Sequence, residues 1–256
     1  MKVTVCEIND APEMLEQDWE KLVTHVRKEA SNLVLLPEMP FYTWLAGTKQ
    51  FDTQAWQVAV YAHELWLGRL VELSPALVLG TRPVLAAGKR LNEGFAWDET
   101  KGYRSVHTKY YLPDDEGFWE ATWYARGEGD FTPIWCGSMG IGFMICTELW
   151  FLEHARAYGR QGVHLVANPR ATLMETVEKW LVGGRASAIV SGAYSLSSNR
   201  ASPPGKLPSF GGQGWVVGPD GDVLGLTSAA RPFVTVEIEL KEAEAAKLTY
   251  PRYVLE

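Results

Sequence analysis

The chain opens with short apolar runs separated by a stretch of helical spacing. Residues 2–8 alternate as a half-buried strand does, whereas residues 12–30 place apolar side chains at the spacing of a helix. A second apolar run, residues 32–36, follows. Because two strands joined by a helix pair in parallel with a right-handed crossover, this order predicts a β–α–β unit. Residues 52–73 then predict a long second helix.

The remainder of the chain alternates between further strands and helices. Turns at residues 87–89 and 137–138 each separate two apolar runs, which is typical of neighbouring antiparallel strands. The other predicted strands are residues 76–85, 91–97, 103–108, 131–136, 139–145, 163–167, 193–198, 215–217, 222–226 and 232–240. The other predicted helices are residues 147–160, 175–192 and 241–248.

This order of elements suggests two similar halves that face each other. No Pro/Ser-rich linker and no low-complexity tract divides the sequence, so residues 1–256 are expected to form a single domain. Mixed strands flanked by helices place the chain in the α/β class. We therefore expect a four-layer α–β–β–α sandwich, in which helices lie outside two mixed sheets.

Composition narrows the classes of function. With 46% hydrophobic and 21% charged residues, the chain resembles an ordinary globular protein, and it has no apolar run of the about 18 residues that a membrane span needs. Three cysteines without paired spacing and no signal-peptide pattern favour a reducing, cytoplasmic environment. A net charge of −7 without a basic stripe argues against nucleic acid as a partner. The histidines lack metal-ligand spacing, so we expect neither a metal nor another cofactor.

Cys146 lies where a strand pattern changes into a helix pattern. The apolar run 140–145 precedes it, and helical spacing begins at Thr147. Open α/β sheets bind ligands at the carboxyl ends of their strands, and the amino end of a helix favours an anion. Both effects favour a thiolate, which is the nucleophilic form of cysteine. The alternative is a core thiol, because free cysteine is among the most buried residue types.

Two charged residues occupy similar positions. Glu38 follows the second predicted strand, between Pro37 and Pro40, and Lys109 follows the strand 103–108. Together with Cys146 they form a chemically sufficient set. The carboxylate takes the thiol proton, the thiolate attacks a carbon that bears a leaving nitrogen, and the ammonium neutralises the oxyanion.

The local sequences around these residues resemble those of the nitrilase superfamily of carbon–nitrogen hydrolases. The motifs that match are those around the family's glutamate base, its lysine, the glutamate that supports the lysine and its cysteine. Two later sequence motifs of the family match as well. The matching segments are residues 35–38, 109–113, 118–120, 142–156, 168–171 and 214–221. Leu152, Trp119 and Gln213 depart from the family pattern, and these departures concern specificity rather than any reacting group.

The resemblance implies a mechanism and an assembly. Cys146 would be the nucleophile, Glu38 the base, Lys109 the oxyanion stabiliser, and Glu120 the residue that orients the lysine. Copies of the chain would pair as a homodimer or assemble into a higher homo-oligomer. Thr147 stands where nitrilases carry tryptophan, which is closer to the amidase and carbamoylase branches. We therefore expect hydrolysis of a small-molecule amide, with nitriles and N-carbamoyl compounds as alternatives on the same site.

Several side chains near these residues are candidates for binding substrate. Aromatic residues within a few positions of each catalytic candidate suggest an apolar pocket for an apolar acyl group. Arg170 could bind a substrate carboxylate, although an arginine more often lies on the surface beside an acidic neighbour. The substrate-binding candidates are Tyr42, Trp44, Thr147, Trp150 and Arg170.

Two other classes of protein remain as alternatives. A Cys–His hydrolase would use His107 or His154, but a histidine on a strand is more often structural, and no partner pattern accompanies either one. A noncatalytic assembly module would have little physical reason to keep the set Glu38, Lys109 and Cys146.

Overall fold

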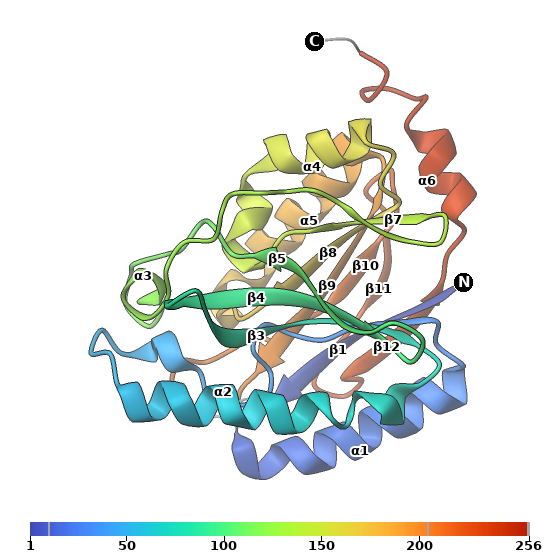
Figure 1. The fold of residues 1–256 in the computed structure, drawn as a ribbon. Coiled ribbons are helices and arrows are strands. Elements are labelled where there is room, and N and C mark those ends of the chain that lie inside the picture. The colour runs from blue at the N-terminus through green and yellow to red at the C-terminus, as the bar shows by residue number, and fades with distance from the viewer. Residues whose placement is uncertain (10, 204, 255–256) are drawn as a thin grey trace.

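A computed structural model describes residues 1–9, 11–203 and 205–254 of the chain (Figure 1). The strands are β1 (Lys2–Asn9), β2 (Leu33–Leu35), β3 (Leu77–Ala86), β4 (Lys89–Asp98), β5 (Gly102–Thr108), β6 (Ile134–Cys136), β7 (Met139–Phe143), β8 (Leu165–Arg170), β9 (Tyr194–Ala201), β10 (Trp215–Val217), β11 (Val223–Leu226) and β12 (Phe233–Glu237). The α-helices are α1 (Pro12–Glu29), α2 (Thr53–Leu67), α3 (Glu120–Trp123), α4 (Leu152–Arg160), α5 (Val177–Ser191) and α6 (Leu240–Ala246). Short 3₁₀ helices are η1 (Leu45–Gly47), η2 (Leu70–Leu73), η3 (Cys146–Trp150) and η4 (Met174–Thr176). Within these ranges, every helix is too short or too polar to cross a bilayer.

The strands form two halves that meet at one ladder. Their order is β5-β4-β3-β2-β1-β9-β8-β7-β6, with β12 on β1 and with β10 and β11 beside β9. The first three strands are parallel in one half, and β7, β8 and β9 are parallel in the other. β1 and β9 pair only near their carboxyl ends, from Glu7 opposite Asn199 to Asn9 opposite Ala201. The mixed α/β class is therefore confirmed, although this ladder joins the two expected sheets into one.

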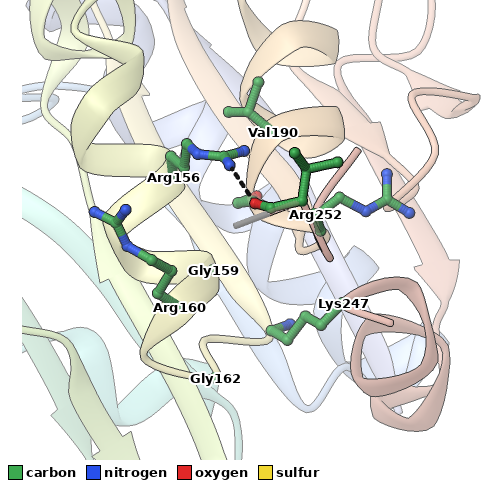
Figure 2. A pocket seen from close by; sticks show the side chains of 9 residues that line it. Arg156, Gly159, Arg160, Gly162, Val190, Lys247 and Arg252 are labelled. Carbon is green, nitrogen blue, oxygen red and sulfur yellow. Dashed lines mark hydrogen bonds between the residues drawn. The ribbon is translucent and has the colours of Figure 1, made fainter. Parts of the chain in front are cut away.

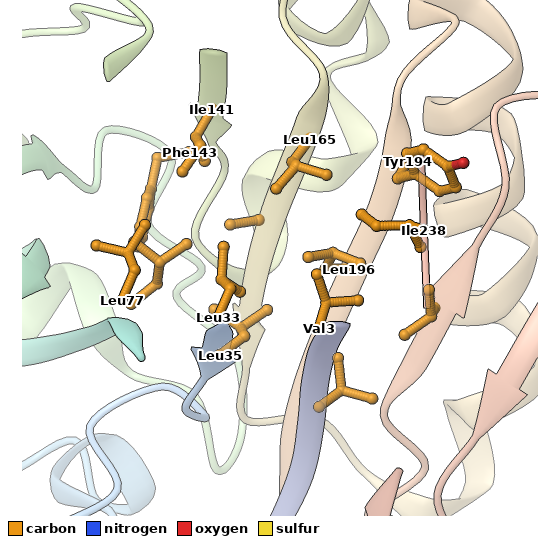
Figure 3. Packing of buried hydrophobic residues seen from close by; sticks show 14 of the residues in the cluster. Val3, Leu33, Leu35, Leu77, Ile141, Phe143, Leu165, Tyr194, Leu196 and Ile238 are labelled. Atoms are coloured by element: carbon orange, nitrogen blue, oxygen red, sulfur yellow. The ribbon is translucent and has the colours of Figure 1, made fainter. Parts of the chain in front are cut away.

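Alternation along the strands produces the layers. In β1, Val3 and Val5 belong to an apolar cluster shared by strands of both halves (Figure 3). Cys6 and Ile8 belong to a second cluster that includes residues of α1. Helices α4 and α5 cover the outer side of the half that contains β7, β8 and β9, away from α1 and α2 (Figure 1). This arrangement is compatible with the expected four-layer sandwich.

Some predicted elements have different bounds in the structure. The helix expected at residues 147–160 is divided into η3 and α4, because Phe151 adopts a non-helical backbone conformation (φ −95°, ψ 73°). The helix expected at residues 52–73 ends at Gly68 and continues as η2, which agrees with the poor helix propensity of glycine. β8 runs to Arg170, so residues 168–170 lie in the strand rather than after it. Helix α3 is not among the helices that the sequence predicted.

Gly142 lies where β7 packs against α4, so a substitution at this position tests that packing. A Cβ atom at Gly142 would lie 2.4 Å from the ring of Tyr158. That ring cannot move easily, because its hydroxyl donates to the Phe143 carbonyl at 3.0 Å. We predict that Gly142→Ala lowers the free energy of unfolding by about 1–3 kcal/mol through overpacking, as measured by urea denaturation.

The matched control is Gly47→Ala. There the nearest atom to an added Cβ is in the Trp44 ring at 3.7 Å, an ordinary van der Waals contact. Equal stability losses in Gly142→Ala and Gly47→Ala would contradict the packing argument.

Candidate active site

Glu38 lies just beyond the carboxyl end of β2, in a tightly held turn. Its backbone N–H donates to the Arg170 carbonyl at 3.2 Å, and the next residue, Met39, has a positive φ of 45°. The side chain is fully buried. Its Oε1 accepts hydrogen bonds from Asn92 at 2.7 Å and from Lys109 at 2.8 Å. Its Oε2 is also buried and has no hydrogen-bond partner among the described residues, so this oxygen can accept a proton.

Arg200 at the end of β9 holds the backbone of this turn. It is 1% exposed and donates to the carbonyls of Glu38 at 3.2 Å, Met39, and Tyr42 at 2.6 Å. The turn that carries the Glu38 carboxylate therefore belongs to one half of the fold, and Arg200, which holds it, belongs to the other half. Sequence reasoning did not find Arg200, because nothing local distinguishes it from a surface arginine.

Lys109 is a fully buried cation between two carboxylates. It follows β5, and its Nζ donates to Glu38 Oε1 at 2.8 Å and to both oxygens of Glu120 at 2.8 and 2.6 Å. Burial lowers the pKa of Lys109, but Glu120 and Glu38 together raise it well above its usual value. The lysine is therefore positively charged at neutral pH, despite the lack of solvent.

Glu120 begins the short helix α3 and is also fully buried. Burial raises the pKa of Glu120 to about 8, with Glu38 adding to the effect and Lys109 opposing it. The physical cause is that one cation faces two carboxylates in a fully buried site. The structure brings Glu120 into direct contact with Lys109, as the resemblance implied.

Cys146 begins η3, three residues beyond the end of β7. Its φ of 48° is unusual for a residue with a side chain and costs about 1–3 kcal/mol. Asn168 in β8 holds the strained turn, because its side-chain amide donates to the carbonyls of Met144 at 2.5 Å and Cys146 at 3.2 Å. The Cys146 Sγ lies 4.0 Å from the Ala171 carbonyl oxygen, so the thiol has no strong hydrogen-bond acceptor there.

The structure corrects the expected ionisation of this thiol. Burial raises the pKa of Cys146, Glu38 raises it further, and Lys109 only partly opposes them. The expected effect of a helix N-terminus is weak here, because η3 is a five-residue 3₁₀ helix. The resting form is therefore a protonated thiol, which needs a base to become a nucleophile.

The expected substrate-binding aromatics divide into two groups. Trp44 is buried against Phe118 and Phe210 and donates to the Gly117 carbonyl at 3.0 Å, in the aromatic cluster that also takes in Tyr42. That cluster includes Ala171, whose carbonyl approaches Cys146.

Trp150 does not belong to the aromatic cluster that contains Trp44. It is 41% exposed and lies against Trp180 of α5, at a ring-centroid distance of 5.0 Å. Thr147 is half-buried, directly beside Cys146. Its role in binding substrate stays a prediction.

Arg170 is buried rather than exposed, so the interpretation as a surface arginine is wrong. Its guanidinium donates to Ser197 at 2.7 Å, to Thr172 at 2.7 Å and to the Gln213 carbonyl at 2.8 Å. It also lies over the Trp215 ring at 4.0 Å. Burial lowers the pKa of Arg170 to about 9. Each of its three nitrogens already donates to the protein, which favours a structural role over capture of a substrate carboxylate.

A separate basic hollow lies away from these residues. It has a volume of about 590 Å³ and is formed by α4, α5 and the segment after α6, with Arg156, Arg160, Lys247 and Arg252 in its wall (Figure 2). Arg156 donates to the Val254 carbonyl at 3.2 Å. None of Glu38, Lys109, Glu120 and Cys146 lines this hollow, so we assign the candidate site to the buried group.

Removing Lys109 tests whether charge holds this group together. In Lys109→Met, two buried carboxylates lose their cation, so we predict that the free energy of unfolding falls by about 3–5 kcal/mol at pH 8. The pKa of Glu120 then rises further, and the folded state binds more protons than the unfolded state. Because Glu120 in the wild type already titrates near pH 8, the deficit relative to wild type should be largest above that pH and shrink as the pH falls from about 9.5 to about 7, as measured by urea denaturation.

The second variant, Lys109→Met combined with Glu120→Gln, removes the carboxyl group whose pKa is raised and should recover part of the stability at about pH 9.5. A deficit that is the same at about pH 7 and about pH 9.5 would mean that lost packing, and not charge, is the cause.

Comparison with known proteins gives one consistent result. Residues 2–248 match the family model of the carbon–nitrogen hydrolases. A nitrilase from Pyrococcus abyssi is 25% identical over 94% of this chain and 90% of its own length. The chloroplastic omega-amidase of Arabidopsis thaliana is 26% identical over 91% of this chain and 65% of its own length.

Solved structures share the fold at lower identity. A carbon–nitrogen hydrolase from Helicobacter pylori G27 has a TM-score of 0.86 at 21% identity, over 98% of this chain and 94% of its own. Nit3 of Saccharomyces cerevisiae, a member of the nitrilase superfamily, has a TM-score of 0.81 at 20% identity, over 99% and 95%. Because the family model spans nearly the whole chain, the chain belongs to the carbon–nitrogen hydrolase family, an enzyme family of the nitrilase superfamily.

Proposed function

We propose that this protein hydrolyses a small-molecule amide to a carboxylic acid and ammonia or an amine, with Cys146 as the nucleophile. One observation carries the proposal. The Oε2 atom of Glu38 is a buried carboxylate oxygen without a hydrogen-bond partner in the described residues, and the charge of Glu38 acts on the Cys146 thiol. A buried acceptor without a donor is costly unless the reaction uses it.

Acylation follows from these positions. Glu38 Oε2 takes the thiol proton, and the thiolate attacks the amide carbon to give a tetrahedral intermediate. Its oxyanion is stabilised by Lys109 and by the backbone N–H of Thr147, which lies in the first turn of η3, where N–H groups lack helical partners. Each such donor contributes about 3 kcal/mol to lowering the barrier. Glu38 then returns the proton to the leaving nitrogen, and the C–N bond breaks to leave a thioester.

Deacylation uses the same groups in reverse. Glu38, again unprotonated, accepts a proton from a water molecule, and the resulting hydroxide attacks the thioester carbon. The C–S bond breaks, the thiolate regains a proton from Glu38, and the carboxylic acid leaves. Glu120 keeps Lys109 charged and oriented in both steps through its two hydrogen bonds.

The surroundings of the site favour a substrate with an apolar acyl group. A hollow of about 670 Å³ lies beside the segments that lead to the site, since Phe118 is close in sequence to Glu120 and Leu173 is close to Ala171. Its apolar wall consists of Phe118, Leu173, Met174, Leu207 and Pro208. Relatives of this chain are named nitrilase, omega-amidase and N-carbamoylputrescine amidase, so the family alone does not select among these substrates.

The first test concerns the nucleophile and the base. We predict that Cys146→Ala abolishes release of ammonia from amides and that Glu38→Gln lowers kcat at least about 1000-fold, because the thiol then has no base. Mass spectrometry of wild type quenched during turnover should find the acyl group on Cys146.

Cys136→Ala is the matched control, because this half-buried cysteine lies in β6 and should leave turnover unchanged. Wild-type turnover in Cys146→Ala would refute the proposed mechanism.

The second test concerns which class of carbon–nitrogen bond is hydrolysed. Thr147 in place of tryptophan favours amides, so we predict a kcat/KM for a phenyl-bearing amide at least about 10-fold higher than for the matching nitrile. An N-carbamoyl amine completes the panel, with ammonia as the common product measured. Faster turnover of the nitrile would assign the chain to the nitrilase activity instead.

A further inference from the structure

The carboxylate of Glu148 joins the two segments that carry the nucleophile and the lysine. Glu148 lies in η3, is fully buried, and accepts on Oε2 a hydrogen bond from the backbone N–H of Ile145 at 2.7 Å. Its Oε1 accepts a second hydrogen bond, from the backbone N–H of Tyr110 at 2.8 Å. Ile145 directly precedes Cys146. Tyr110 directly follows Lys109, so one side chain holds both backbones.

Strand pairing does not fix these two segments relative to each other. Lys109 follows β5, which is the outermost strand of one half, and Cys146 follows β7, which lies in the other half between β6 and β8. The ladder between the halves is formed by β1 and β9; β2, β3 and β4 separate it from β5, and β8 separates it from β7. Hydrogen bonds from backbone N–H groups to a charged carboxylate are short and strong. Glu148 therefore supplies a direct polar bridge where the sheet has none.

His107 on β5 completes the bridge. Its Nε2 lies 2.8 Å from Glu148 Oε2, and its Nδ1 lies 3.0 Å from the carbonyl oxygen of Asp130. A neutral imidazole donates from one nitrogen only, whereas an imidazolium donates from both. The charged form therefore satisfies both contacts. It also balances a carboxylate that would otherwise be an unpaired buried charge, since the two side chains are 2% and 0% exposed.

The other groups around His107 leave this pairing intact. On β4, the opposite position is Gly94, where a Cβ atom would approach the His107 Cβ at 3.4 Å. Phe131 faces the imidazole at a ring-centroid distance of 5.0 Å. The carboxylate of Asp130 binds within its own turn. His154 stacks on Phe131, and burial lowers its pKa, with Glu153 and Glu148 opposing this effect and His107 adding to it.

We propose that Glu148 and His107 are a positioning pair, which sets the separation between the Cys146 thiol and the Lys109 ammonium without touching the substrate. The inference rests on the proposed function, because it assumes that these two groups act on the same carbonyl. The geometry of the reacting groups depends on the pair because a displacement of about 1 Å at a reacting centre lowers rates by about 100-fold.

The test replaces each member of the pair by glutamine. Glu148→Gln keeps the shape but offers a single acceptor oxygen to two backbone N–H donors. We expect kcat to fall about 10- to 100-fold in Glu148→Gln and in His107→Gln, with KM within about threefold of wild type. Because the two residues act as one unit, the double variant should be no slower than Glu148→Gln alone. Losses that multiply in the double variant would overturn the pairing.

Two measurements do not require turnover. The rate at which iodoacetamide alkylates Cys146, read by peptide mass spectrometry, should fall in Glu148→Gln. Hydrogen–deuterium exchange should rise in the peptides that contain Ile145 and Tyr110. If the protein hydrolyses no amide, both measurements still test the pair, so failure of the proposed function is distinguishable from failure of this inference.

His164→Gln is the matched control. His164 is also buried and lies 3.3 Å from a glutamate, Glu244, but its Nδ1 accepts from the N–H of Gly140 instead of bridging the two segments. We expect wild-type kcat and alkylation rate in this variant. Unchanged alkylation and exchange in Glu148→Gln, or equal kcat losses in His164→Gln and His107→Gln, would overturn the proposal.

Discussion

A buried ammonium with two carboxylates is the interaction on which the rest of this structure depends. Lys109 has no exposed surface, and an unpaired cation there would cost more free energy than a fold of this size can spare. Glu38 and Glu120 compensate it through three hydrogen bonds, and they come from two separate segments, the turn after β2 and helix α3. These segments are therefore constrained to one arrangement. The strained turn at Cys146 is held separately, by the hydrogen bonds of Asn168.

The two halves of the fold make that arrangement possible. Parallel strands within each half end at a common edge, and the ladder between β1 and β9 joins the halves at their carboxyl ends. The Glu38 turn leaves β2 in one half, while Arg200 at the end of β9 binds its carbonyls from the other half. The site is thus formed at the junction, where buried polar groups from both halves hydrogen-bond to one another.

The raised pKa of the Cys146 thiol changes how the site must work. A thiolate that is stable at rest needs only substrate, but a protonated thiol beside a carboxylate becomes reactive when its proton is transferred. Glu38 presents one oxygen to Lys109 and Asn92 and leaves the other without a partner among the described residues. These hydrogen bonds give the two oxygens of the Glu38 carboxylate different roles. The presence of a glutamate in the sequence does not predict that difference.

The sequence by itself determined the α/β class and most strand positions, and it selected Glu38, Lys109 and Cys146 as candidates, because apolar periodicity and local motifs are properties of neighbouring residues. It did not determine the break at Phe151 or the burial of Arg170, and it gave no sign of Asn92, Glu148, His107 or Arg200 as partners. Those depend on contacts between segments far apart in the chain, such as the 38-residue separation between Tyr110 and Glu148. Only the packing of the two halves decides which polar groups lose water together, and that loss decides their charge and their hydrogen bonds.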